Sequence, residues 1–194
     1  GWYFDGSNDY VEIGNQSVFD TQESFSVSLW IDTNNITDKR LFGKGSNSAY
    51  EMLSETTNNQ IRWRVHDGSV KTVEGGTALS DGTWYHVVVI YDKEQGETRI
   101  YVNGSLDGTL TGIGTISSTS DPLYLGRNNS GGYYQGKMDQ FIMYDKVLST
   151  TEISALYNSD SGDSTPDTTD MVAWYNFEQT GDTLENQTDT TTTL

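Results

Sequence analysis

Residues 25–31 read Phe-Ser-Val-Ser-Leu-Trp-Ile, and residues 84–91 read Trp-Tyr-His-Val-Val-Val-Ile-Tyr. The first stretch alternates large apolar side chains with Ser26, Ser28 and Trp30, and the second interleaves two sets of apolar side chains. A period of two residues indicates β-strands, because successive side chains of a strand point to opposite faces. The same period recurs over residues 61–66 and 99–103.

Turn-forming residues separate these stretches along the chain. Asn103-Gly104 joins two of them and is typical of a type I′ hairpin, because both residues tolerate positive φ. Only residues 148–157 have a helical pattern, with a Ser/Thr cap followed by a glutamate. Many short strands between turns predict an all-β sandwich or barrel.

The charge balance excludes several partners. Asp and Glu number 28 and Lys and Arg number 11, giving a formal net charge of −17. Phosphate backbones and anionic membrane surfaces repel so acidic a chain, so we expect no nucleic acid partner. The absence of cysteine excludes disulfides and thiolate chemistry. No run of about 18 apolar residues occurs, so we expect no membrane insertion.

Composition divides the chain into four parts. Residues 1–157 carry the strand pattern and are predicted to form one domain. Residues 158–170 are rich in Ser, Thr and Asp and indicate an acidic linker. Residues 171–186 return to strand character, as a strand that completes the sandwich or begins a following repeat. Residues 187–194 are predicted to be a disordered tail.

Six motifs resemble the laminin-G-like domains of the concanavalin A-like superfamily, in the bacterial branch related to pentraxins. They occur in family order over residues 4–11, 24–30, 84–89, 100–104, 123–127 and 136–149. The resemblance implies a two-sheet antiparallel β-sandwich, a jelly roll that binds ligands at its rim loops or on its concave face. We expect the chain to belong to a larger multidomain protein.

The order of one strand departs from the family pattern. Family members usually begin with a strand resembling residues 172–178, Val-Ala-Trp-Tyr-Asn-Phe-Glu, which here lies near the end. The chain is either one unit of a tandem array or a circularly permuted jelly roll. In both cases we expect residues 171–178 to fill the first-strand slot, because a bare sheet edge would otherwise remain. The slot is filled within a monomer or, in a strand-swapped dimer, by a second copy.

The resemblance also implies a structural Ca²⁺. Asp139 is the leading candidate ligand, with partners from Asn176, Glu178, Asp5 and Gly6. Six to eight oxygen ligands suit Ca²⁺ better than a softer metal. The alternative for Asp5 is an Asx turn, in which its carboxylate only shapes the chain.

Sugar sites combine aromatic platforms with amide and charged groups, because a sugar has apolar C–H faces and many hydroxyls. Three places meet this description: the loop 127–135, the loop 44–50, and a predicted concave face. The candidate residues are Arg127, Asn128, Asn129, Tyr133 and Tyr134 in the first, Tyr50 in the second, and Trp30, Arg62 and Arg64 in the third. For each of them, ordinary packing is the alternative.

Catalysis is not expected. His86 alternates with apolar residues, which is typical of a packed histidine, and no strand carries the alternating carboxylates of related glycosidases. We therefore expect a non-catalytic module that binds a carbohydrate or surface ligand, in a secreted or surface-displayed microbial protein. That protein would be an adhesin or a polysaccharide-processing enzyme. The alternative is a structural spacer or protein-interaction repeat in an extracellular array.

Overall fold

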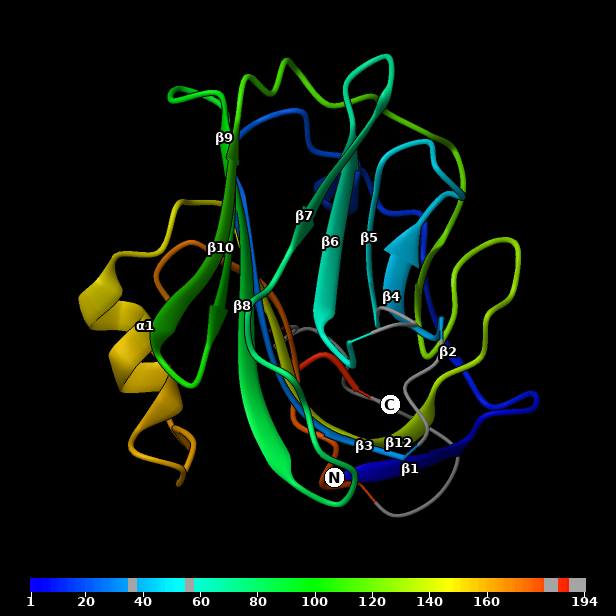
Figure 1. The fold of residues 1–194 in the computed structure, drawn as a ribbon, viewed down its shortest axis with the longest axis vertical. Helices are drawn as coiled ribbons and strands as arrows, with labels where there is room; N and C mark the ends of the chain where they lie inside the picture. Colours follow the sequence, from blue (N-terminus) through cyan, green and yellow to red (C-terminus); the bar gives the residue numbers. More distant parts are fainter. Residues whose placement is uncertain (35–37, 55–57, 180–184, 189–194) are drawn as a thin grey trace.

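The stretches with a period of two form strands of two antiparallel sheets that pack face to face (Figure 1). This structure is a computed structural model that describes residues 1–34, 38–54, 58–179 and 185–188. Its sandwich architecture confirms the all-β fold predicted from the sequence.

The larger sheet, sheet A, is built around two long strands near its centre. Its strands in spatial order are β1 (Trp2–Asp5), β12 (Gln135–Tyr144), β3 (Phe25–Thr33), β8 (Trp84–Asp92), β9 (Glu97–Val102) and β10 (Ser105–Thr111), and β13 (Met171–Tyr175) also pairs with β12. Every residue of β3 is buried, because one face meets the other sheet and the opposite face is also covered.

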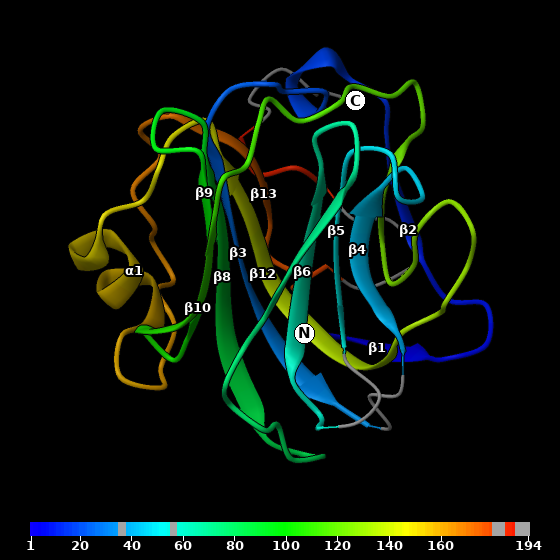
Figure 2. The ribbon, with the colours of Figure 1, turned by 45° about the horizontal axis from the view of Figure 1, so that its top comes forward.

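The smaller sheet, sheet B, lies opposite (Figure 2). Its strands in spatial order are β2 (Val11–Gly14), β11 (Leu123–Leu125), β4 (Arg40–Lys44), β5 (Tyr50–Ser54), β6 (Ile61–His66) and β7 (Val70–Glu74). The edge strands β7 and β10 contact each other and bring the two sheets together on one side. On the other side, the loop between β1 and β2 connects the sheets.

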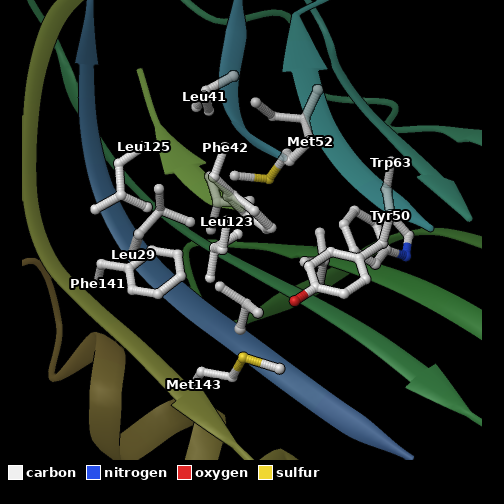
Figure 3. Packing of buried hydrophobic residues seen from close by; sticks show 14 of the residues in the cluster. Leu29, Leu41, Phe42, Tyr50, Met52, Trp63, Leu123, Leu125, Phe141 and Met143 are labelled. Atoms are coloured by element: carbon white, nitrogen blue, oxygen red, sulfur yellow. The ribbon is translucent and has the colours of Figure 1, made fainter. Parts of the chain in front are cut away.

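The core fills the space between the sheets. Figure 3 shows side chains of sheet A (Leu29, Phe141, Met143) facing those of sheet B (Leu41, Phe42, Tyr50, Met52, Trp63, Leu123, Leu125). Trp63 is fully buried, and its indole N–H donates to the hydroxyl of Thr98. The alternation in the sequence therefore marks the core face of β3 and β6 correctly, whereas both faces of β8 are apolar.

A short helix covers the outer face of sheet A. Helix α1 (Thr150–Tyr157) begins with a capping box, in which the Ser149 side chain and Glu152 bond to each other's backbone N–H groups. Ile153 and Leu156 pack on Val88 and Ile142 of the sheet. The helix ends at Tyr157 and is capped by Asn158, whose φ of 45° is left-handed. The short 3₁₀ segment Ser17–Phe19 follows β2.

The C-terminal segment supplies the first-strand equivalent. β1 pairs with residues 135–138 of β12, and β13 pairs with residues 141–144 on the same edge. A bulge at Gln140, whose φ is +47°, separates the two pairings. Phe177 follows β13, is buried, and packs edge-to-face on Trp2 with ring centroids 5.8 Å apart. The strand thus docks within the same chain.

The division of the chain into domain, linker and tail stays a prediction. Residues 180–184 and 189–194 lie outside the described residues, so most of the predicted tail does as well. No helix in the described part of the chain is long and apolar enough to cross a membrane.

Candidate functional site

The loop between β11 and β12, residues 126–134, carries an arginine surrounded by tyrosine rings. The guanidinium carbon of Arg127 lies 4.9 Å from the ring centroid of Tyr10, 4.8 Å from that of Tyr124 and 5.4 Å from that of Tyr133. Each distance falls within the range of a cation–π interaction. Tyr10 also contacts Tyr124 and Tyr133 directly, so the four side chains form one cluster.

A buried amide fixes the shape of this loop. Asn128 is buried; its Nδ2 donates to Oε2 of Glu51 at 2.6 Å, and its Oδ1 accepts from the backbone N–H of Ser130 at 2.9 Å. Gly131 and Gly132 then turn the chain with φ of +105° and +75°, which side chains rarely allow. The loop is therefore held in place before any ligand arrives.

Contacts to sheet B hold the loop from outside. Oδ1 of Asn129 accepts from the backbone N–H of Gly45 at 2.9 Å, and the backbone N–H of Arg40 donates to the carbonyl of Gly132 at 2.8 Å. Nε of Arg127 donates to the carbonyl of Asn128 at 2.8 Å, which orients the guanidinium among the rings. Arg127, Asn129 and Tyr133 lie together in this loop, and their predicted contact with a ligand stays a prediction. Placing Asn128 at the ligand was wrong, because its amide is buried and bonds to Glu51 and Ser130.

The loop between β1 and β2 brings Tyr10 to the same place, and both loops lie side by side at the right of Figures 1 and 2. A hollow of about 550 Å³ lies next to Tyr10, with Tyr3, Asn8, Asp9 and Gln179 in its lining. Tyr3 is 54% exposed and Tyr10 is 45% exposed, so both rings face solvent. We call Tyr3, Tyr10, Tyr124, Arg127 and Tyr133 together the tyrosine surface.

A buried carboxylate lies behind the tyrosine surface. Glu51 is buried on β5, and Arg64 lies 3.2 Å from its Oε1 while Nε of Arg40 lies 3.7 Å from its Oε2. The two arginines and Asn128 together surround this charge, as a buried carboxylate requires. Burial, together with a hydrogen bond to Glu12, raises the pKa of Tyr124.

The prediction that Trp30, Arg62 and Arg64 share one concave face is wrong. Trp30 lies on β3 with its side chain on the outer face of sheet A, stacked on Tyr157 at a centroid distance of 6.0 Å. Arg62 and Arg64 lie on β6 in sheet B, where Arg62 pairs with Glu74 at 2.7 Å. In β3 and in β6, alternate side chains point to the core and to the outside, as the sequence predicts. The two strands belong to different sheets, so Trp30 and the two arginines lie on opposite outer faces of the sandwich.

Two of the predicted ligand-binding tyrosines belong to the core. Tyr50 is 3% exposed, and its hydroxyl donates to the carbonyl of Phe19 at 2.8 Å. Tyr134 is fully buried against Phe4, and its hydroxyl donates to the carbonyl of Asp32 at 3.1 Å. Burial raises the pKa of both phenols. Placing these two tyrosines at the ligand was therefore wrong, and only Tyr133 of the adjacent pair reaches the surface.

The five predicted calcium ligands do not form one site. Asp5 pairs with Gln135, four residues from Asp139 along β12, which is about 13 Å in a strand. Its carboxylate accepts from the backbone N–H groups of Ser7 and Asn8, which is the Asx turn, and Gly6 lies in that turn. These backbone hydrogen bonds lower the pKa of Asp5. Asp5 and Gly6 therefore do not meet Asp139.

Asp139 and Glu178 are the part of the predicted set that lies together. The amino group of Gly1 lies 3.2 Å from Oδ2 of Asp139 and 3.9 Å from Oε1 of Glu178. Asn176 lies two residues before Glu178, and its Oδ1 accepts from the backbone N–H of Glu178. The described residues contain no group of three His, Cys, Asp or Glu side chains placed to hold a metal. Calcium binding stays a prediction, with two carboxylates to support it.

His86 is a packed histidine, as predicted. It is 1% exposed, its Nε2 lies 2.8 Å from the hydroxyl of Ser28, and its ring lies beneath Trp30 and Tyr157. Burial lowers the pKa of His86 to about 3, so the ring is neutral at physiological pH. Because the ring is covered, it cannot reach a substrate in this conformation.

The two antiparallel sheets and the helix on the outer face of sheet A form a jelly roll. The laminin-G profile of the concanavalin A-like lectin/glucanases superfamily matches residues 5–154, and the chain belongs to this superfamily. The resemblance carried by the six motifs is therefore confirmed.

Similar proteins come from bacteria and animals. Botulinum neurotoxin type E of Clostridium butyricum is 24% identical over 175 residues, which are 79% of this chain and 13% of the toxin. Pentraxin-related protein PTX3 of Homo sapiens is 28% identical over 145 residues, 68% of this chain and 38% of that protein. The chain thus spans well under two thirds of either relative.

Among solved structures, a candidate carbohydrate-binding protein from Bacteroides ovatus superposes with a TM-score of 0.75. The alignment is 20% identical and covers 96% of this chain and 55% of that one. This likeness establishes the fold.

Sequence reasoning missed Tyr3, Tyr10 and Tyr124. They come from β1, the following loop and β11, so no spacing in the sequence links the three to one another, although Tyr124 lies in the same motif as Arg127. Tyr10 does occur in the first of the six motifs, but nothing in that motif indicates an exposed ring beside residue 127.

Proposed function

We propose that this chain is a non-catalytic carbohydrate-binding module that acts outside the cell, and that the tyrosine surface is its binding site. The observation that carries the proposal is the set of three tyrosine rings held around Arg127 beside the open hollow at Tyr3 and Tyr10. The superfamily and the description of the Bacteroides ovatus protein support the same function.

The chemistry of the tyrosine surface suits a sugar. A tyrosine ring stacks on the apolar C–H face of a sugar, and its hydroxyl exchanges hydrogen bonds with sugar hydroxyls. Asn8 and Asp9 line the hollow and add an amide and a carboxylate. Because the loop bearing Arg127 is fixed by Asn128, binding costs little ordering of the protein.

The open shape of the hollow indicates the kind of ligand. A hollow of about 550 Å³ that is open to solvent accommodates a chain of sugar units that lies across it. The ligand would then contact Tyr3 and Tyr10, which both line the hollow. We expect such a glycan to be recognised by its shape and hydroxyl pattern, and turnover is not expected.

A glycan array tests the proposal. We expect the wild-type chain to bind at least one class of glycan and Tyr10→Ala and Tyr133→Ala to lower that binding at least about tenfold. Leu106→Ala is the matched control, because Leu106 is 57% exposed on β10, on the opposite side of the sandwich.

Three outcomes would overturn the proposal. Binding that both tyrosine variants retain would place the glycan elsewhere, and an equal loss in Leu106→Ala would indicate a general effect of surface apolar area. Silence across the array, with retained binding to a partner protein, would favour a spacer or protein-interaction repeat.

A further inference from the structure

A second hollow lies on the outer face of sheet A, beside the end of α1. Its volume is about 200 Å³, and it is lined by Trp30, Trp84, Asp139, Gln140 and residues 160–162. We call it the tryptophan pocket. It shares no lining residue with the hollow at Tyr3 and Tyr10, so it is separate from the tyrosine surface.

Two indole rings form the aromatic walls of the tryptophan pocket. Trp30 is held by ring contacts on Tyr157 and His86, with centroids 6.0 and 5.2 Å away. Trp84 begins β8 and is partly exposed. The ammonium of Lys137 lies 6.0 Å from the Trp84 ring centroid, so this ring already has one ammonium group of the chain beside it. Indole rings attract cations more strongly than other side-chain rings do.

Two carboxylates complete the lining. Asp139 is opposite Trp30 in the register of β12 with β3, and its Oδ1 accepts from the backbone N–H of Gln140 at 2.9 Å. Asp160 enters from the loop after α1, where its Oδ1 accepts from the hydroxyl of Tyr157 at 2.8 Å. The seven lining residues, all within the described part of the chain, include these two acids and no basic side chain.

The loop that carries Asp160 is held tightly against Trp30. Residues 158, 159 and 160 have φ of 45°, 51° and 69°, a left-handed run that L-residues rarely adopt. Nδ2 of Asn158 donates to the carbonyl of Gly162 at 2.9 Å and closes the loop. A Cβ at Gly162 would lie 3.3 Å from Nε1 of Trp30, so the backbone approaches the ring closely. The carboxylate of Asp160 therefore has a defined position at the pocket.

We propose that the tryptophan pocket binds a small organic cation through its ammonium group, with Trp30 and Trp84 against the cation and Asp139 and Asp160 balancing its charge. The pocket is smaller than the roughly 300–1,000 Å³ typical of drug-sized ligands, which limits the ligand to an ammonium group with a few carbon atoms. An anion would be repelled by both carboxylates. A neutral sugar would leave the charge of Asp160 without a cation.

Two cationic groups of the chain lie close to the tryptophan pocket. The amino group of Gly1 lies 3.2 Å from Oδ2 of Asp139, and Lys137 pairs with Asp32 at 3.1 Å. These groups reduce the local negative charge but do not line the pocket. Within the described residues Asp160 forms no ion pair, and its carboxylate accepts a hydrogen bond from Tyr157. Its charge is therefore the one best placed to select a ligand.

Calorimetry with a matched pair of probes tests the inference. Choline carries a quaternary ammonium, and 3,3-dimethylbutan-1-ol has the same shape without the charge. In buffer with EDTA, so that calcium plays no part, we expect choline to bind at least about tenfold more tightly than the alcohol. We expect Asp160→Asn to weaken choline binding about fivefold or more, and Trp84→Ala to do the same.

Asp145→Asn is the matched control variant. Asp145 is exposed just after β12 and does not line the pocket, so this variant removes the same unit of charge elsewhere on the chain. We expect it to change choline affinity by less than about twofold, because a distant exposed charge is screened by salt. Circular dichroism of each variant confirms folding, and Asp160→Asn carries the test if Trp84→Ala does not fold.

Several results would overturn the inference. Equal affinity for the two probes, or no binding of choline by the wild type, would rule out an ammonium site. An equal loss in Asp145→Asn and Asp160→Asn would indicate general attraction by a chain of net charge −17. The glycan array is independent of these results, so the two proposals fail or succeed separately.

Discussion

Replacing Asn128 with alanine should destabilise the whole sandwich, although Asn128 lies in a surface loop. The change removes the bond from Nδ2 to Glu51, at 2.6 Å, and the two bonds that Oδ1 accepts from Ser130. A hydrogen bond to a buried charge contributes about 1.5–3 kcal/mol, and the bonds to Ser130 add about 1 kcal/mol. We expect the free energy of unfolding to fall by about 2–4 kcal/mol.

Thermal and urea unfolding measure this loss. For a chain of 194 residues, 1 kcal/mol corresponds to about 2–4 °C in Tm, so the expected decrease is about 5–15 °C. Asn129→Ala is the control in the same loop, because its Oδ1 accepts one neutral bond from Gly45 and the loss should be about 1 kcal/mol. If Asn128→Ala lowers Tm no more than Asn129→Ala does, the buried carboxylate is not the reason for the effect.

A double-mutant cycle assigns the loss to Glu51. Glu51→Gln keeps the shape of the side chain and removes its charge, so Asn128→Ala should cost less in that background. We expect a coupling energy above about 0.5 kcal/mol between the two positions. Additive effects would show that Asn128 acts through the loop turn alone.

Three further predictions concern the C-terminal strand β13, the buried His86 and the carboxylate of Asp139. A chain ending at residue 170 should lose several kcal/mol of stability or fail to fold, because it lacks the buried Ala173, Tyr175 and Phe177, and unchanged urea unfolding would refute this. The folded-state pKa of His86 is lowered to about 3, so its contribution to stability is complete above the unfolded pKa of about 6.5 and is lost as pH falls toward 3. NMR should find the ring neutral at pH 5, and a midpoint near 6.5 would contradict its burial. EDTA should lower the Tm of the wild type but not of Asp139→Asn if the sequence-based prediction of structural calcium is correct, and an unchanged wild-type Tm would count against it.

The sequence predicts where the strands of this fold lie better than it predicts which strands pair with each other. The period of two identifies the core side of β3 and β6 correctly, because burial of one face is a local property of each strand. Which sheet a strand joins depends on pairing between distant residues. The pattern therefore could not show that Trp30 and Arg64 lie on opposite faces.

The same limit applies to the candidate site: the sequence indicates the residues that share one loop, and it does not indicate those that strand pairing brings to it. Arg127 and Tyr133 lie close together in one loop, so their association is visible in the sequence. Of the neighbours Tyr133 and Tyr134, one must face inward, but local pattern does not indicate which. Tyr3 and Tyr10 reach the site only through the pairing of β1 and the turn at Asp5, which no local pattern specifies.

The shared edge of β12 has a consequence for how the chain folds during synthesis. The indole of Trp2 donates to the carbonyl of Gln179, a contact between residues 177 positions apart. Residues 141–144 of β12 emerge from the ribosome before their partner β13, so this part of the edge has no partner until β13 has been made. An unpaired edge can recruit a strand from another molecule. Slow translation through residues 145–175 should therefore prolong the period in which nascent chains aggregate.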